Sequence, residues 1–276
     1  MKFIDPRIDF AFKKIFGSED TKEILISFLE SLLELEGDKR IREIQIGDPY
    51  LMPRIEVLKL SILDVKCTDH RGVSYIVEMQ IRKTRAFLKR IQYNASKTYV
   101  NQISKADDYP KLNQVIAVTI TDFSIFDPKD VSHYVSCHIT TEKENGGHFL
   151  NGIVYYFIEL SKFDKTDKVP DNILDKWIYF IKMAGELESV PEKMREEPFD
   201  KAFEKAMLAN MTLEESEYYD KACMAVADAR GAIELALEEG MEKERVIIAR
   251  KMLKKGTDIE YISEITGFTL EQIQHL

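Results

Sequence analysis

Features of secreted, membrane and zinc-binding proteins are scarce in this sequence. Its three cysteines lie at positions 67, 137 and 223 and form no Cys-x-x-Cys pair, which argues against a disulfide framework and against a zinc ribbon. No stretch approaches the roughly 20 uninterrupted apolar residues that a membrane helix needs. The first residues carry no apolar segment of a secretory signal. We therefore expect a protein of the reducing cytoplasm that does not enter a membrane.

Basic residues are also in the minority, with 39 Lys and Arg against 48 Asp and Glu and a net charge of −9. Affinity for a phosphate backbone comes mainly from Lys and Arg, so this balance is unfavourable for a nucleic-acid enzyme. Residues 81–105, however, contain no acidic residue. Their basic residues are Arg82, Lys83, Arg85, Lys89, Arg90, Lys97 and Lys105. Such a run is either the ordinary solvated face of a helix or a surface that contacts phosphates, and its single sign favours the second.

Strand and helix patterns alternate up to about residue 190, and only helical patterns follow. The expected helices cover residues 9–16 (ended by Gly17), 20–35 (with a capping box from Asp20 to Glu23, ended by Gly37), 84–104 and 172–183. The expected strands cover residues 41–46, 61–66, 73–81, 115–121, 131–140 and 152–159. This order predicts an α/β core over residues 1–190 and a helical C-terminal region over residues 191–276, with a long amphipathic helix over residues 221–255.

The strands expected over residues 61–66 and 73–81 are separated by a polar break that contains Gly72, the pattern of a hairpin. Side chains alternate between the two faces of a strand, so Asp64 shares a face with Lys66, and Glu78 shares one with Gln80. A carboxylate on each arm can then converge on one oxygen-rich patch, which suits Mg²⁺. The alternative is a solvated face of polar residues, which is common on antiparallel sheets.

Asp64, a hairpin and then Glu78-Met-Gln80 resemble the active-site signature of the PD-(D/E)XK phosphodiesterase superfamily. Further stretches are similar to one branch, the recombination-promoting nuclease/putative transposase family: Asp9-Phe-Ala-Phe-Lys-Lys-Ile-Phe-Gly17, then Arg90-Ile-Gln-Tyr93 with Gln102 to Tyr109, then residues 249–253 with 259–276. The resemblance spans nearly the whole chain. It implies a restriction-endonuclease-like core, a mixed central sheet flanked by helices, with an all-helical C-terminal extension.

The same resemblance implies a Mg²⁺-dependent nuclease, with Mn²⁺ as an alternative ion. Asp64 and Glu78 would bind the ion, which positions the scissile phosphate and lowers the pKa of a bound water. Gln80 would orient that water. Asp9 matches an acid of the first helix that often completes the metal site in this superfamily, although N-terminal capping of the helix explains an Asp there equally well.

Gln80 departs from the superfamily pattern, which usually has Lys at this position to stabilise the charge of the transition state. Lys66 and Arg82, each two residues from a signature residue, are the candidates to supply a positive charge instead. The Pro that gives the superfamily its name is replaced by Leu63. This replacement costs little, because that Pro has no chemical role.

The basic helix is expected to present Lys89, Arg90, Tyr93 and Lys97 to nucleic acid, preferably DNA. The preferred function is a DNA endonuclease of the recombination-promoting nuclease/transposase type. The alternative is a catalytically weak or inactive nuclease-fold protein that serves as a nucleic-acid or protein binding module.

The last residues predict a pair of short helices. Thr257 is expected to cap the first helix, Gly267 to end it and Thr269 to cap the second, which suggests a helix-turn-helix. The second helix has no Lys or Arg to contact phosphates. We therefore expect packing or self-association, with a homo-oligomer formed through the C-terminal helices, rather than reading of DNA.

Overall fold

The computed structural model describes residues 2–48, 50–51, 61–104 and 107–276. Its main sheet has six strands in the order β1-β4-β5-β6-β8-β7. These are β1 (Ile44–Ile46), β4 (Val65–Asp69), β5 (Ser74–Gln80), β6 (Val115–Thr121), β8 (Ile153–Glu159) and β7 (Val135–His138), and a separate pair is formed by β2 (Tyr50–Leu51) and β3 (Ser61–Ile62). Strands β5, β6 and β8 run parallel, whereas β1, β4 and β7 are antiparallel to their neighbours. The predicted mixed sheet is thus confirmed.

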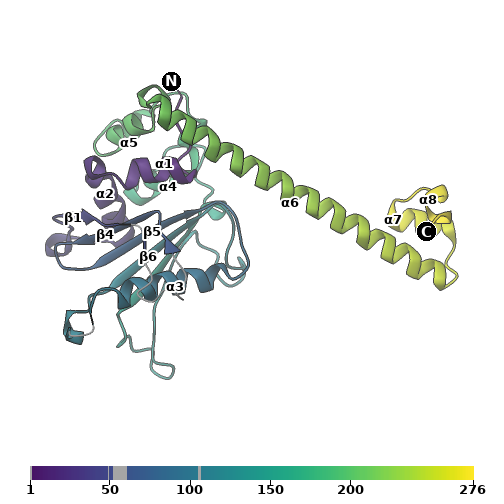
Figure 1. The fold of residues 1–276 in the computed structure, drawn as a ribbon, viewed down its shortest axis with the longest axis horizontal. Helices are drawn as coiled ribbons and strands as arrows, with labels where there is room; N and C mark the ends of the chain where they lie inside the picture. Colours follow the sequence, from purple (N-terminus) through teal and green to yellow (C-terminus); the bar gives the residue numbers. More distant parts are fainter. Residues whose placement is uncertain (1, 49, 52–60, 105–106) are drawn as a thin grey trace. The chain divides into compact units, whose positions relative to one another are not determined.

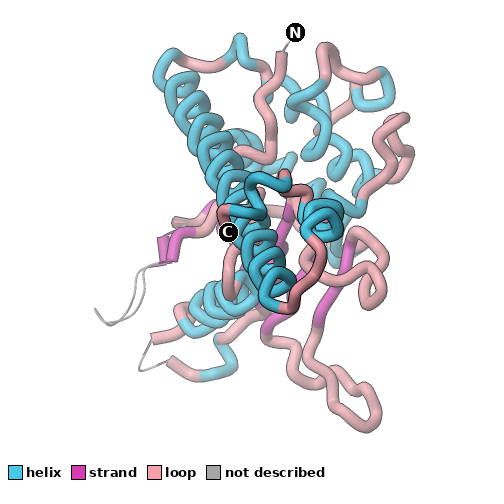
Figure 2. Tube along the Cα trace, turned by 90° about the vertical axis from the view of Figure 1, so that its right-hand side faces the viewer, coloured by secondary structure: helices cyan, strands magenta, loops and turns pink. Residues whose placement is uncertain are grey.

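Helices cover both faces of the sheet. Helices α1 (Asp9–Phe16), α2 (Lys22–Leu33) and α4 (Ile173–Met183) lie on one side and α3 (Phe87–Val100) lies on the other, as Figures 1 and 2 show. Every residue of β6 is buried, which is what its uninterrupted β-branched sequence predicted for a strand covered on both faces. Short 3-10 turns connect these elements: Glu19–Thr21, Gly37–Lys39, Tyr109–Lys111, Leu160–Lys162, Ala184–Glu186, Glu192–Met194 and Leu208–Asn210.

Trp177, the only tryptophan, lies at the centre of the helical layer. Its ring centroid is 5.9 Å from that of Phe16 and 4.3 Å from that of Phe199, which begins helix α5 (Phe199–Ala206). Its indole N–H donates a hydrogen bond to Ser27 Oγ at 3.1 Å. The buried ring therefore joins α1, α2, α4 and α5 with its one polar atom satisfied.

The predicted hairpin is present, but its first strand is β4 and not residues 61–66, since Ser61–Ile62 form β3 in the separate pair. Strands β4 and β5 are antiparallel, with Val65 opposite Val77 and Thr68 opposite Ser74. Extending this register by one residue places Asp64 opposite Glu78, but Asp64 lies in a bend before β4 and not in a strand. On β5 the predicted alternation holds, because Ile76 packs with Ala95 of α3, so that Glu78 and Gln80 share the α3 side of the sheet.

The capping box predicted at the start of the second helix is wrong. Helix α2 has no side-chain cap at its N-terminus. Instead, Asp20 pairs with Lys205 and Glu23 pairs with Lys201, so both carboxylates bind lysines of α5. At the other end the chain leaves the helix at Glu34, whose φ is +52°, and not at Gly37.

Two further elements are shorter than predicted. The basic helix, expected over residues 84–104, is α3, which begins after Ala86, a residue in the left-handed region with φ +59°. The strand expected over residues 131–140 is the shorter strand β7. It begins later than predicted because Val131 lies in a turn, where its backbone N–H donates to Asp127 O at 2.9 Å. The helices expected over residues 9–16 and 172–183 are confirmed as α1 and as α4 with Asn172 as its N-cap.

Backbone contacts divide the chain into a unit of Met1–Tyr219 and a unit of Asp220–Leu276. In the first unit Phe203 of α5 packs against Phe3 and Phe180, with ring centroids 5.1 and 4.9 Å apart. The first compact unit therefore runs beyond residue 190, where the sequence analysis proposed a boundary because strand patterns end there.

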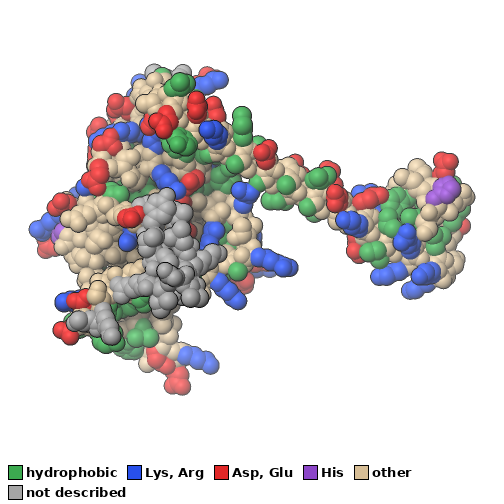
Figure 3. Space-filling model, viewed as in Figure 1, with side chains coloured by type: hydrophobic (Ala, Val, Ile, Leu, Met, Phe, Trp, Pro, Cys, Tyr) green, Lys and Arg blue, Asp and Glu red, His purple; other side chains and the backbone are tan. Residues whose placement is uncertain are grey.

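Helix α6 (Leu213–Lys254) contains 42 residues and crosses the boundary between the two units. The amphipathic pattern expected over residues 221–255 is wrong, because the apolar residues are not gathered on one side. Ile233 and Leu235 are two residues apart, about 200° around a helix, and both are exposed. Apolar side chains along this helix are visible in Figure 3.

The second unit ends in α7 (Ile259–Thr266) and α8 (Leu270–Gln274), which pack around a small core of Ala249, Ile262, Phe268 and Ile273. Asp258, not Thr257, caps α7, because its side chain accepts the backbone N–H groups of Glu260 and Tyr261. The other two predictions are confirmed: Gly267 ends α7 with φ +73°, and Thr269 caps α8. Among the helices that the structure describes, none combines the length and apolar composition needed to cross a bilayer.

Candidate active site

The hairpin itself holds Asp64. The backbone N–H of Met79 on β5 donates to Asp64 Oδ2 at 2.7 Å, and the side chain of Asp64 is 17% exposed. This bond fixes the carboxylate beside the strand that carries Glu78 and Gln80. The second oxygen, Oδ1, is turned toward α1.

Asp9 and Lys13 of α1 complete this cluster. Lys13 Nζ lies 2.8 Å from Asp9 Oδ1 and 3.6 Å from Asp64 Oδ1. Burial and then the neighbouring carboxyl of Asp9 raise the pKa of Asp64 to about 8. Burial lowers the pKa of Lys13, but the two carboxylates raise it by more. Two acids and one ammonium thus share a partly buried patch.

Of the two roles weighed for Asp9, capping is not the one that the structure realises. The N-cap of α1 is Ile8, and no side chain caps that end. Asp9 is the first helical residue, and its carboxylate binds Lys13 one turn further on. A ligand role therefore remains our proposal for it.

Glu78 is turned toward α3 on the other side of the sheet. Its Oε1 accepts a hydrogen bond from Asn94 Nδ2 at 2.9 Å. Burial raises the pKa of Glu78, and this is opposed by the hydrogen bond from Asn94 and by the charge of Arg90. The carboxylate is thus partly buried and has a hydrogen-bond donor.

Gln80 is held by the same helix. Its Oε1 accepts a hydrogen bond from Arg90 Nη2, and the guanidinium carbon of Arg90 lies 5.5 Å from the centre of the Phe87 ring. This leaves the amide N–H groups of Gln80 as donors. The side chain is therefore oriented by the basic helix.

The substrate-contacting residues predicted on α3 do not all lie on its exposed side. Lys89 and Arg90 are exposed, and Tyr93 is 38% exposed. Lys97 is only 7% exposed, and its ammonium lies 5.7 Å from the centre of the Tyr93 ring. The exposed basic surface of α3 therefore does not extend to Lys97, which corrects the expectation that all four residues face solvent together.

Lys66 does not meet the signature acids. It pairs with Ile76 across the hairpin, and within the described part of the chain no ion pair joins it to Asp64 or Glu78. The ammonium that contacts Asp64 comes from Lys13, which the sequence analysis did not single out. Its position four residues after Asp9 was the available signal, because residues at this spacing are neighbours on a helix.

The expected convergence of Asp64, Glu78 and Gln80 on one patch is not reached. Asp64 binds α1 and Glu78 binds α3, and these helices lie on opposite faces of the sheet (Figure 1). Over residues 2–48, 61–104 and 107–276, no three His, Cys, Asp or Glu side chains lie close enough together to hold a metal ion. The pair Asp9 and Asp64 still fits Mg²⁺ in donor type, since this ion usually takes one or two carboxylates plus water and phosphate oxygens.

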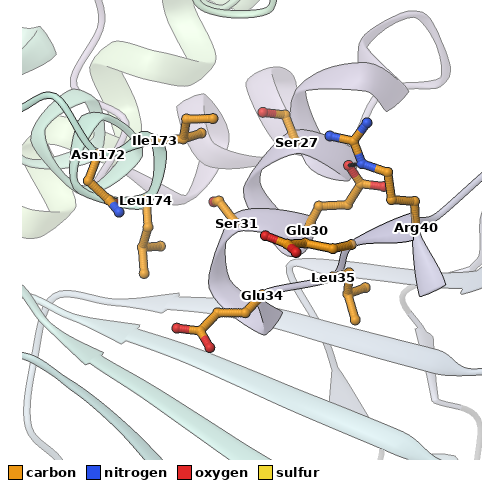
Figure 4. A pocket seen from close by; sticks show the side chains of 10 residues that line it. Ser27, Glu30, Ser31, Glu34, Leu35, Arg40, Asn172, Ile173 and Leu174 are labelled. Carbon is orange, nitrogen blue, oxygen red and sulfur yellow. Dashed lines mark ion pairs between the residues drawn. The ribbon is translucent and has the colours of Figure 1, made fainter. Parts of the chain in front are cut away.

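A separate hollow of about 580 Å³ lies beside α2 and the start of α4, as Figure 4 shows. Glu30, Glu34 and Arg40 line it, and Glu30 is bonded to the backbone N–H of Ile41 at 2.7 Å. None of the predicted site residues contributes to this hollow. Its acids are therefore distinct from the candidate active site.

Comparison with protein families agrees with this geometry. A family model described as PD-(D/E)XK nuclease family transposase matches residues 6–236. The chain belongs to this family. A second model, described as the C-terminal HTH domain of the Rpn/YhgA-like nuclease family, matches residues 242–276 of this PD-(D/E)XK protein. Neither the curated proteins nor the solved structures gave a match. The predicted family and fold are thus confirmed, and the family supports a nuclease-type function.

Proposed function

We propose that this chain is a divalent-metal-dependent phosphodiesterase, a DNA endonuclease of the recombination-promoting nuclease/transposase type. The observation that carries the proposal is the carboxylate pair of Asp9 and Asp64, which lies at the start of the family's signature hairpin and contacts one ammonium. Asp64 is largely buried and Asp9 is exposed, and two neighbouring carboxylates destabilise one another when both are ionised. A hard divalent cation relieves this repulsion and suits their oxygen atoms.

Each residue of the candidate site has a separate proposed role. Asp9 and Asp64 would hold Mg²⁺ or Mn²⁺. Glu78, which is bonded to Asn94 in this structure, would have to turn away from α3 to join them as a third carboxylate. When bound, such an ion polarises the phosphate and lowers the pKa of a bound water. Gln80, oriented by Arg90, would donate from its amide to that water or to a phosphate oxygen. The exposed residues Lys89, Arg90 and Tyr93 would contact the DNA backbone.

The competing function is a catalytically weak or inactive nuclease-fold protein that binds nucleic acid or a protein. The observation that favours it is that Glu78 is bound to Asn94 and does not join Asp9 and Asp64. The two functions share a fold, and both allow binding of nucleic acid. They differ in whether a divalent ion enables cleavage.

Cleavage of supercoiled plasmid separates the two functions. We expect nicked or linear products when Mg²⁺ or Mn²⁺ is present, no products in excess EDTA, and recovery when the ion is added back. Binding of the same plasmid in EDTA, followed by gel shift, serves as the control for an intact DNA surface. DNA binding with no cleavage under either ion would reject the endonuclease and favour the binding module.

Lys13, rather than Lys66, is expected to supply the positive charge that Gln80 lacks. Because Lys13 contacts both acids, Lys13→Met should lower the cleavage rate by about 100-fold, the usual effect of losing one group that stabilises transition-state charge. Lys66→Met, the matched control on the hairpin, should cleave at close to the wild-type rate. Initial rates of plasmid nicking measure both. A Lys66 variant that is slower than the Lys13 variant would contradict this assignment.

The exposed end of α3 is expected to carry the phosphate contacts. Lys89→Gln and Arg90→Gln should each weaken DNA binding evenly across sequences and reduce the slope of log K against log salt by ~0.9. Lys97→Gln should leave the slope unchanged, because that side chain is buried. Fluorescence anisotropy with a labelled duplex in EDTA gives the slopes. An unaltered slope in the Lys89/Arg90 double variant would exclude α3 as the DNA surface.

The match of residues 242–276 to an HTH domain supports DNA as the partner. We propose self-association through the C-terminal helices as a further role, since α8 contains no Lys or Arg. Cys67 and Cys137 form no disulfide, which is consistent with the proposed cytoplasmic location.

A further inference from the structure

The exposed side of α3 carries positive charge at one end only. Lys89 and Arg90 lie in its first turn. The exposed positions that follow in the helix are all neutral: Gln92, Tyr93, Ser96 and Val100. The helix has 14 residues and is therefore about 21 Å long. Duplex DNA carries one phosphate charge per ~1.7 Å, so a helix that followed its backbone would need cations along its whole length. Phosphate contacts of α3 are thus confined to its first turn.

Tyr93 is the next residue on the stripe of α3 that begins at Lys89. Residues four apart are neighbours on a helix, so Lys89, Tyr93 and Lys97 follow one another along one side. Tyr93 is 38% exposed, and the ammonium of the buried Lys97 lies 5.7 Å from the centre of its ring. Because the ammonium lies over one face of the ring, a ligand would meet the opposite face. An oriented aromatic ring therefore lies one turn beyond the first phosphate contact.

Shielding of the buried Lys97 from water is the simplest alternative role for this ring. An aliphatic side chain of similar size would serve that purpose equally well. Cations for the phosphates beside an aromatic face for the base are the combination with which proteins bind single-stranded nucleic acid. In a duplex, the neighbouring base pairs cover both faces of each base. Only a base that has left the stack can therefore lie on the ring.

We propose that the ring of Tyr93 stacks on an unpaired base of the DNA while Lys89 and Arg90 contact its phosphates, so that the preferred substrate is single-stranded or locally unpaired DNA. The proposal rests on the proposed function, to which it adds a substrate class. Stacking tolerates any sequence, because every base has a π face. It also adds affinity that does not depend on Lys or Arg, which matters for a chain with a net charge of −9.

Fluorescence anisotropy of the full chain in EDTA tests the proposal with a labelled single-stranded oligonucleotide and with the duplex of the same sequence. Wild type should bind the single strand more tightly than the duplex. Tyr93→Leu should weaken single-strand binding on the order of 10-fold and leave duplex binding nearly unchanged. Tyr93→Phe keeps the ring and should bind both probes like wild type. Tyr109→Leu is the matched control, because Tyr109 is 81% exposed and lies outside α3, and it should change neither affinity.

A fluorescent base analogue in the single strand reports on stacking directly, because stacking on an aromatic ring quenches its emission. At saturating protein, wild type and Tyr93→Phe should quench it more strongly than Tyr93→Leu does. Retained duplex binding by Tyr93→Leu shows that this variant is folded.

Two sets of results would overturn the inference, and they are distinguishable. If wild type binds the single strand no more tightly than the duplex, or if Tyr93→Phe loses as much single-strand affinity as Tyr93→Leu, the ring does not stack on an unpaired base. An endonuclease that acts on duplex DNA would still stand. If wild type binds neither probe, DNA is not the partner, and the proposed function fails together with the inference.

Discussion

Asp64→Asn is expected to abolish divalent-dependent cleavage and most of the stabilisation that Mg²⁺ or Mn²⁺ gives to the protein, and Glu78→Gln should do the same. The variants keep the size of the side chain but lose the charge that attracts the cation. An ion that binds only the folded state stabilises it by RT ln(1 + [L]/Kd), ~2.7 kcal/mol at a hundredfold excess over Kd. Since a bound ion lowers the barrier by several kcal/mol, cleavage should fall on the order of 10³-fold.

Asp69→Asn is the matched control for these two variants. Asp69 is a buried carboxylate of the same strand pair, bonded to Arg71 Nε at 2.8 Å and to the hydroxyl of Tyr75 at 2.9 Å. The Asp69→Asn substitution should lower the melting temperature but leave the shift caused by Mg²⁺ or Mn²⁺ unchanged. Melting curves with increasing Mg²⁺ and plasmid cleavage measure both effects. A full ion-dependent shift in Asp64→Asn would rule out this carboxylate as a ligand.

Local rules in the sequence were sufficient where neighbours along the chain decide the structure. The helix Asp9–Phe16, the strand Val115–Thr121 and the faces of β5 follow from periodicity and from Gly17. Thr269 at the start of α8 follows from its capping box with Gln272. In each of these cases the deciding contacts lie within a few residues.

Predictions were wrong where a residue contacts a partner that is distant along the chain instead of its sequence neighbours. Asp20 and Glu23 have the spacing of a capping box, but both carboxylates bind lysines about 180 residues away along the chain. In the same way, the alternation rule placed Asp64 on a strand face with Lys66. Its bond to Met79 N–H and its contact with Lys13 instead direct it to α1.

The candidate site was predicted in part. The sequence predicted the signature acids because their motif is local. It did not predict that Asp64 contacts α1 while Glu78 contacts α3, because this depends on which helix covers each face of the sheet. Lys13 and Asn94 were missed for the same reason. Each follows a noted residue, Asp9 or Arg90, at a spacing of four, but only the packing of the helix against the hairpin shows what that neighbour contacts.

Without divalent ions, the first unit is expected to lose stability as pH rises from about 5 to 9. The pKa of Asp64 is about 8 in the folded state, against an ordinary value of about 3.9 in the unfolded chain. Between these values the folded state holds a proton that the unfolded state has released, so stability falls with pH. The stabilisation of the folded state by the protonated Asp64 carboxyl is complete below a pH of about 4. It decreases by no more than about 1.4 kcal/mol per pH unit and is lost once the pH passes about 8.

Urea unfolding in EDTA at pH 5 and pH 9, followed by the fluorescence of Trp177, tests this expectation. This tryptophan is fully buried and reports on the first unit. Asp64→Asn should be closer to wild type in stability at pH 5 than at pH 9, and at pH 9 it should exceed wild type by on the order of 2 kcal/mol. Saturating Mg²⁺ should remove this advantage by giving the ionised carboxylate a partner. Equal stabilities of wild type and variant at pH 9 would mean that Asp9 and Asp64 do not repel one another in the folded state, and that no cation is needed between them.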